Sequence, residues 1–170
     1  MYAETVNYFH NVFTKSQNLL ELLQSDYTFL NQQLAEHYGL EGEYSEQIEL
    51  TCLPTDNRGG VLGMGSVLAA TSLPERTSPV LRGQWVLEQL LGKPPPPAPP
   101  NVPELEEAKG IHDEMSIRQM LEIHRADPAC AGCHKDMDAL GLGLEKFDAL
   151  GRWRETYANQ ALIDSKGVLK

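Results

Sequence analysis

The sequence contains no run of about 18 apolar residues, the length that a membrane-crossing helix needs. Basic residues are scarce too, with 14 Lys and Arg against 24 Asp and Glu, so the formal net charge is −10. Nucleic acids and anionic membrane surfaces attract basic proteins, and this balance therefore argues against both. We expect a chain with no membrane span and no nucleic-acid partner.

Cysteine is also rare. The 170 residues contain 3 cysteines, an odd number that does not suit a disulfide framework. The opening "MYAETVNYFHNVFTKSQ" lacks the basic segment, the unbroken apolar segment and the small-residue cleavage site of a signal peptide. The chain is therefore expected to be either cytosolic or a piece of a longer exported protein.

Hydrophobic periodicity predicts a mainly α-helical chain. Residues 1–24 carry apolar side chains at three- and four-residue steps, and residues 25–39 repeat the pattern up to Gly39, so two helices are expected. Residues 48–53 alternate apolar with polar side chains and predict one short strand.

Helix-capping residues mark two further helices. Ser78 followed by Pro79 predicts a helix that runs to Gly92. Ser116 and Gln119 have capping-box spacing at the start of another helix. Between these helices, residues 94–104 are rich in proline and predict a stiff polyproline II spacer.

The segment "DPACAGCHKDMDALG" contains Cys130, Cys133 and His134 in the spacing C-x-x-C-H. A c-type haem needs two thiols that each add to one vinyl group of the porphyrin, and an imidazole that binds the iron. One helical turn presents both sulfurs on one side, and the following histidine points its ring to the metal. The motif predicts one covalent haem c, with His134 as an axial iron ligand.

Two alternatives for the same residues stay open. Zinc needs four nitrogen or sulfur ligands, and the other candidates, Cys52, His112 and His124, have no paired spacing. A redox dithiol is typical of a βαβ setting, whereas the flanking segments here are helical. Asp136 and Asp138, within the same segment, are typical of solvated charges at a helix end.

The other haem contacts are less constrained by the sequence. Met64, in a glycine-rich segment, and His124, at the end of the helix before the motif, are the first candidates for the sixth iron ligand; an open sixth position is an equal alternative. Haem propionates usually meet cationic donors. The candidates for this role are Arg58, Arg82, Arg152 and Arg154.

Two long stretches carry a family resemblance. Residues 58–105, from "RGGVLGMG" to "NVPEL", and residues 124–155, "HRADPACAGCHKDMDALGLGLEKFDALGRWRE", resemble the cytochrome-like domains of unknown function in large exported planctomycete and verrucomicrobial proteins. The chain departs from that pattern at Ala139, where the family has proline, and at Cys52. The resemblance implies a mono-haem module displayed outside the cytoplasm, in the periplasm or beyond it, with other domains of the same chain as partners.

The resemblance also implies a domain organisation and matching positions. Residues 1–40 resemble the helical end of a preceding domain and 161–170 the start of a following segment. The sequence itself divides the rest into a helical segment with a glycine-rich stretch (41–93), the spacer (94–104) and the haem-binding lobe (105–160). The positions that match without a known role are Arg58, Arg82, His124, Asp138, Gly141, Glu145, Phe147, Asp148, Gly151 and Arg154.

Together these features predict a mainly α, cytochrome c-like module that transfers single electrons to a redox partner protein. Its acidic surface suits a basic partner. A haem peroxidase or oxidase, with an open iron position and a distal His124 or His112, is the first alternative. A zinc-bound or dithiol interaction module is the second. Whether the chain is an enzyme stays open, with electron transfer favoured.

Overall fold

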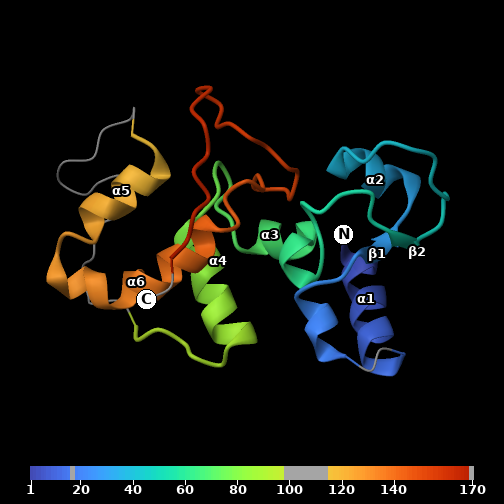
Figure 1. Cartoon of the computed structure of the whole chain (residues 1–170), viewed down its shortest axis with the longest axis horizontal. Helices are drawn as coiled ribbons and strands as arrows, with labels where there is room; N and C mark the ends of the chain where they lie inside the picture. The colour runs from blue at the N-terminus through green and yellow to red at the C-terminus, as the bar shows by residue number, and fades with distance from the viewer. Residues whose placement is uncertain (16–17, 98–114, 169–170) are drawn as a thin grey trace. The chain divides into compact units, whose positions relative to one another are not determined.

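A computed structural model describes residues 1–15, 18–97 and 115–168, and over these residues the chain is mainly α-helical with one small sheet, as predicted (Figure 1). Two compact units form. The first consists of Met1–Thr77 and Phe147–Arg154, and the second of Ser78–Lys146 and Glu155–Lys170. The domain limits expected from the sequence stay a prediction.

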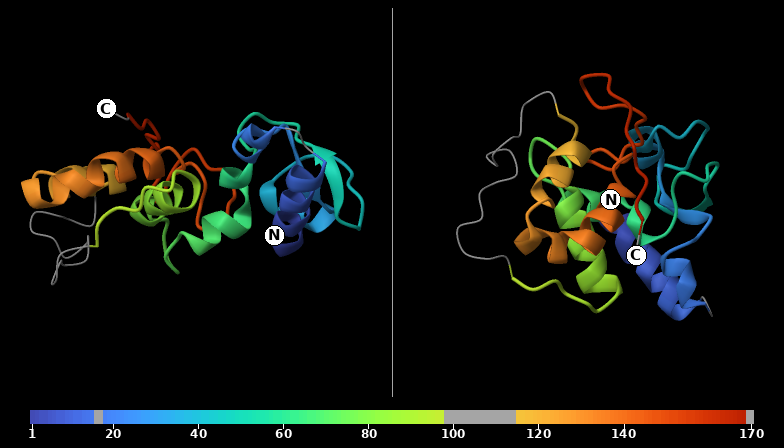
Figure 2. Two further views of the ribbon diagram at one scale, coloured as in Figure 1. Left: turned by 90° about the horizontal axis from the view of Figure 1, so that it is seen from below. Right: turned by 60° about the vertical axis from the view of Figure 1, so that its left-hand side comes forward.

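The first unit contains α1 (Tyr2–Thr14), η1 (Leu19–Leu22), β1 (Tyr27–Leu30), α2 (Gln32–Tyr38), β2 (Glu49–Cys52), η2 (Val61–Gly63) and α3 (Gly65–Ala70). Strands β1 and β2 pair antiparallel, with Tyr27 opposite Cys52 and Leu30 opposite Glu49. The strand expected at 48–53 is thus confirmed. Helix α1 packs beside β1, as the views in Figure 2 also show.

Two of the predicted helices need correction. The segment 25–39 is not one helix, because Tyr27–Leu30 pairs with β2 and only Gln32–Tyr38 is helical. Asn31 caps this shorter helix by accepting a hydrogen bond from the backbone N–H of Leu34 (3.1 Å). The segment 1–24 is also interrupted, since α1 ends at Thr14 and Leu19–Leu22 forms a separate 3₁₀ turn.

Helix α1 buries polar side chains against the rest of the first unit. Glu4 is 1% exposed, whereas Val6 on the apolar stripe is 48% exposed. The Glu4 carboxylate accepts hydrogen bonds from Thr28 Oγ1 (3.0 Å) and from the Tyr38 hydroxyl (2.6 Å). Burial raises the pKa of Glu4 against the opposing effect of these hydrogen bonds. The buried face of α1 therefore combines the polar residues Glu4 and Asn11 with the apolar residues Tyr8 and Val12.

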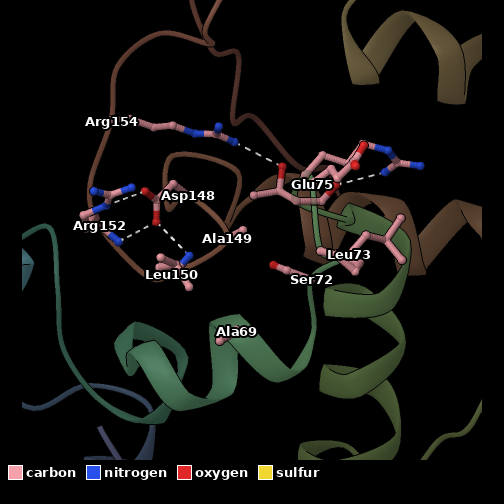
Figure 3. A pocket seen from close by; sticks show the side chains of 12 residues that line it. Ala69, Ser72, Leu73, Glu75, Asp148, Ala149, Leu150, Arg152 and Arg154 are labelled. Atoms are coloured by element: carbon pink, nitrogen blue, oxygen red, sulfur yellow. Dashed lines mark hydrogen bonds and ion pairs between the residues drawn. The ribbon is translucent and has the colours of Figure 1, made fainter.

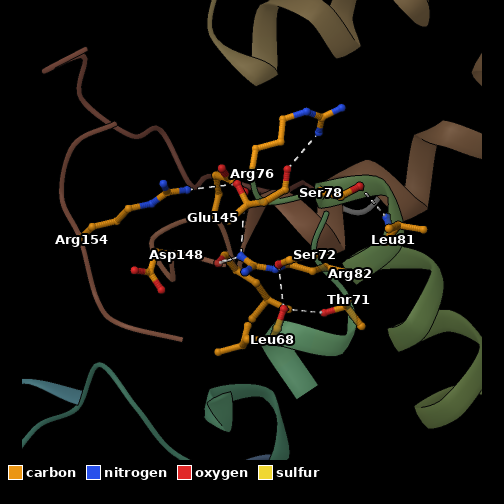
Figure 4. A network of polar contacts seen from close by, with 12 residues as sticks. Leu68, Thr71, Ser72, Arg76, Ser78, Leu81, Arg82, Glu145, Asp148 and Arg154 are labelled. Atoms are coloured by element: carbon orange, nitrogen blue, oxygen red, sulfur yellow. Dashed lines mark hydrogen bonds and ion pairs between the residues drawn. The ribbon is translucent and has the colours of Figure 1, made fainter. Parts of the chain in front are cut away.

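The second unit contains α4 (Pro79–Trp85), η3 (Val86–Leu90, a π-helical turn), α5 (Ile117–His124) and α6 (Pro128–Leu142). Both predicted helix starts are confirmed. Ser78 Oγ accepts from the Leu81 N–H (3.3 Å; Figure 4), and Ser116 with Gln119 forms the capping box. The spacer residues 98–104 and His112 lie outside the described residues.

Helices α4 and α6 cross at close range, and two glycines make this possible (Figures 1 and 2). A Cβ atom on Gly83 of α4 would lie 1.8 Å from the Met137 carbonyl oxygen, and one on Gly141 of α6 would lie 1.7 Å from the Pro79 carbonyl oxygen. Any side chain at either position would force the helices apart. The contact fixes the helix that carries Cys130, Cys133 and His134.

Within the described ranges, no helix combines the length and the apolar character that a membrane crossing requires.

Candidate functional site

Helix α6 presents the C-x-x-C-H residues along one side. Its first turn begins at Pro128, where a missing N–H costs no helical hydrogen bond, and the Asp127 carbonyl accepts from the Cys130 N–H (3.0 Å). Cys130, Cys133 and His134 are three and four residues apart, so they occupy neighbouring positions on the helix surface. Both thiols are half-buried and neither forms a disulfide.

A buried carboxylate lies behind the histidine. His134 Nδ1 is 2.8 Å from Asp138 Oδ1, one helical turn further along α6. An ionised carboxylate only accepts hydrogen bonds, so in this contact Nδ1 is the donor, and in the neutral imidazole Nε2 then keeps its lone pair. The hydrogen bond also restrains the ring, as such contacts do for metal-binding histidines.

Asp138 differs from the expectation of a solvated helix-end charge. Its side chain is fully buried, whereas the neighbouring Asp136 is exposed. Arg125 supplies a compensating charge, with its Nε 3.5 Å from Asp138 Oδ2. Oδ2 makes no hydrogen bond, so the carboxylate is only partly satisfied. Burying a charge without a full set of hydrogen bonds destabilises the folded state. This favours a role of Asp138 toward His134 over a purely structural role.

His124, at the end of α5, contacts His134 edge to face, with ring centroids 4.6 Å apart. Burial lowers the pKa of His124, and the proximity of His134 lowers it further. Two imidazoles on opposite sides of one metal would have centroids roughly 6 Å apart, because each metal–nitrogen bond is about 2.0 Å. The observed contact is shorter. A sixth-ligand role for His124 stays a prediction that requires a different placement of its ring.

The other candidate residues have well-defined surroundings. Met64 is 1% exposed within the first unit, and its role as an iron ligand stays a prediction. Arg58, in the same unit, lies 3.6 Å above the Tyr38 ring and donates to the Gly63 and Gly151 carbonyls. These contacts give Arg58 a structural role. Its role as a donor to haem propionates stays a prediction.

Arg82 belongs to the second unit and is buried there. Its Nη1 donates to the Leu144 carbonyl (2.7 Å) and lies 3.9 Å from Glu145 Oε2, the ion pair that Figure 4 shows. Arg152 and Arg154 belong to the first unit, where Arg152 Nε donates to Asp148 (2.7 Å) and Arg154 Nη2 donates to Thr77 Oγ1 (3.1 Å). The role of Arg82, Arg152 and Arg154 as donors to haem propionates stays a prediction.

The donor set of α6 fits a c-type haem chemically. Two reduced thiols and an imidazole with an available Nε2 are the groups such a cofactor requires from the protein. A porphyrin brings four nitrogens of its own, so one or two protein ligands complete the iron. Among the described side chains, no group of three or more His, Cys, Asp and Glu is placed to hold a metal ion by itself.

Fold and donor set together define a mainly helical domain with a C-x-x-C-H helix backed by a buried carboxylate. Residues 58–157 match the family PSCyt3, described as a protein of unknown function (DUF1588), and this match covers more than half of the chain. The chain belongs to this family, whose name suggests a planctomycete cytochrome-like domain. Residues 1–40 match PSD4, a protein of unknown function (DUF1592). No curated protein and no solved structure matches the chain.

Proposed function

We propose that the chain is a mono-haem c-type electron-transfer module, with haem attached to Cys130 and Cys133 and bound through iron by His134. The observation that carries the proposal is the hydrogen bond between His134 Nδ1 and the buried Asp138, next to two free thiols on the same helix. It orients the imidazole and leaves Nε2 for a metal. The cytochrome-like family name is consistent with this function.

The residues have distinct roles in the proposal. Each cysteine adds across one vinyl group: its sulfur bonds to one vinyl carbon, and its hydrogen passes to the other. Haem iron, once bound, supplies a couple that accepts or releases one electron. His134 binds the iron, Asp138 holds the imidazole and increases its basicity, and Arg125 balances the Asp138 charge. Asp138 is thus a positioning residue that acts through His134.

The location and partners follow from the same proposal. Matches to two different families within one chain support a multidomain protein. We place the module in the periplasm or otherwise outside the cytoplasm, where it exchanges electrons with a redox partner protein. The net charge of −10 favours a basic partner surface, because opposite charges accelerate encounter.

The test is covalent haem attachment. The chain is expressed in a bacterial periplasm with cytochrome c maturation machinery, denatured, and measured as its pyridine haemochrome. The expected result is a c-type α-band that stays with the polypeptide and disappears in the double variant Cys130→Ser, Cys133→Ser. Cys52→Ser is the matched control, because Cys52 is an exposed thiol outside the motif, and it retains the band.

The same material separates the alternatives. Soluble, folded protein without attached haem would contradict the proposal, and stoichiometric zinc in it would establish the interaction module instead. Attached haem with a high-spin ferric spectrum and turnover of peroxide would identify an enzyme. Attached haem with a low-spin spectrum and no turnover is the result that the electron-transfer module predicts.

A further inference from the structure

The first unit contains a pocket of about 540 Å³ whose lining does not include Cys130, Cys133, His134 or Asp138 (Figure 3). Two segments distant in sequence line it: residues 69–77, which follow from the end of α3, and the turn of residues 148–154. Ala69, Leu73 and Ala149 contribute apolar surface. The charged side chains of the lining are Glu75, Arg76, Asp148, Arg152 and Arg154.

Asp148 is fully occupied in building the turn. Its Oδ1 accepts from the backbone N–H groups of Leu150 (2.8 Å) and Arg152 (2.8 Å), and its Oδ2 accepts from Arg152 Nε (2.7 Å). Burial raises the pKa of Asp148, but these hydrogen bonds outweigh it and hold the pKa below its ordinary value. Asp148 therefore stays ionised at neutral pH, and Arg152 balances its charge.

The other two arginines are anchored on a single buried residue. Arg154 Nη2 donates to Thr77 Oγ1 (3.1 Å), and Arg76 Nη1 donates to the Thr77 carbonyl oxygen (3.0 Å). Thr77 is 3% exposed, so both guanidinium groups are fixed by a rigid point of the unit. In Figure 3 the Arg154 side chain extends from the 148–154 turn toward the segment that carries Glu75. Cations that are fixed before binding lose less side-chain entropy when an anion arrives.

We propose that this pocket binds a small organic carboxylate. Its oxygens would meet Arg154 and Arg76, because guanidinium donors match carboxylate geometry. Its apolar part would lie on Ala69, Leu73 and Ala149. Three arginines against Glu75 and Asp148 give the lining a charge of 3 − 2 = +1, within a chain of −10. Such a local reversal of sign attracts anions to this place on an otherwise acidic protein. The proposal does not depend on haem.

Isothermal titration of the full chain with benzoate, phosphate and sulfate at constant ionic strength tests the proposal. We expect saturable benzoate binding that weakens about tenfold in Arg154→Gln, the effect of one charge-assisted hydrogen bond. Arg154→Lys should retain part of the affinity. Arg118→Gln is the matched control: it removes the same charge from the second unit, where Arg118 pairs with Asp164, and leaves the affinity unchanged.

Three results would overturn the assignment. If benzoate binding does not saturate, the pocket is not a specific binding site. Equal weakening in Arg118→Gln and Arg154→Gln would reduce the effect to overall charge. If phosphate or sulfate binds as tightly as benzoate, the pocket is a general oxyanion site and not a carboxylate site. If Arg154→Gln does not fold, judged by the indole N–H signal of the adjacent Trp153, Arg76→Gln makes the same test.

Discussion

Glu4 in the first unit and Asp138 in the second are both almost completely buried, but their surroundings differ. Glu4 receives hydrogen bonds from two hydroxyl groups, those of Thr28 and Tyr38, and neither partner is a strong metal ligand. Asp138 contacts the imidazole of His134 and the guanidinium of Arg125, and one of its oxygens makes no hydrogen bond. The first arrangement joins structural elements, whereas the second modifies a group that can bind a metal.

The two units are also held together by different kinds of contact. The first unit connects α1, β1 and α2 through the Glu4 network, and Arg58 stacks on the Tyr38 ring. The second unit relies on the close crossing of α4 and α6 at Gly83 and Gly141. Each unit contains one of the two tryptophans, Trp153 in the first and Trp85 in the second, so their indole N–H signals can report on each unit separately.

The largest expected effect is at the helix crossing. Gly141→Ala puts a methyl group 1.7 Å from the Pro79 carbonyl oxygen, so α4 and α6 must separate, and we expect a loss of about 3 kcal/mol. Gly132→Ala, on the same helix, meets no atom within 4 Å and should be neutral or slightly stabilising. Urea unfolding followed at the Trp85 indole signal measures both. Equal stability of the two variants would show that the crossing is not close.

The next effect is in the polar network of the first unit. Tyr38→Phe removes a hydroxyl that donates to Glu4 (2.6 Å) and accepts from the Gly65 N–H (2.8 Å). Two buried polar groups lose their partner, and we expect a loss of about 2 kcal/mol, read at the Trp153 signal. Tyr44→Phe is the control, because the Tyr44 hydroxyl makes an exposed contact with the Glu41 carbonyl. A loss confined to the Trp85 signal would contradict this assignment.

Local signals in the sequence predicted the second unit better than the first. Ser78 and Ser116 cap helices within three residues of themselves, so their helix starts could be read directly from the sequence. Apolar spacing and cap-type residues predict a helix over 25–39, but Tyr27–Leu30 forms a strand because it pairs with Glu49–Cys52, which is remote in the sequence. On α1, Val6 belongs to the predicted apolar pattern but is largely exposed, whereas Glu4, Tyr8 and Val12 are buried against other elements.

The candidate site divides in the same way. The motif Cys130, Cys133 and His134 is contiguous and was found from the sequence. Asp138 lies one helical turn from His134, and that spacing was visible, but its burial depends on how α6 packs. The arginine pocket could not be predicted, because residues 69–77 and 148–154 meet only in the folded unit.

A smaller effect distinguishes the role of Asp138 from that of a surface charge. If haem is bound as proposed, Asp138→Asn keeps an acceptor for His134 Nδ1 but removes the negative charge that favours ferric iron. We expect the reduction potential to rise by about 60 mV, a tenfold change in a one-electron equilibrium. Asp136→Asn makes the same charge change at an exposed position of α6 and should shift the potential much less. Equal shifts of the reduction potential in the two variants would contradict a positioning role for Asp138.

The smallest effect concerns pH and the buried Glu4. Burial raises the pKa of Glu4 above its ordinary value of 4.5, so the folded state holds the proton more tightly than the unfolded state. This contribution to stability is complete below pH 4.5 and is lost as the pH rises through the higher, folded-state pKa. Glu4→Gln cannot ionise, so its stability relative to the wild type should increase as the pH rises from about 4 to about 7. The exposed Glu36→Gln change on α2 is the matched control, and urea unfolding at the Trp153 signal measures both variants. A constant difference between Glu4→Gln and the wild type across this range would mean that the hydroxyls of Thr28 and Tyr38 fully offset the burial of the charge.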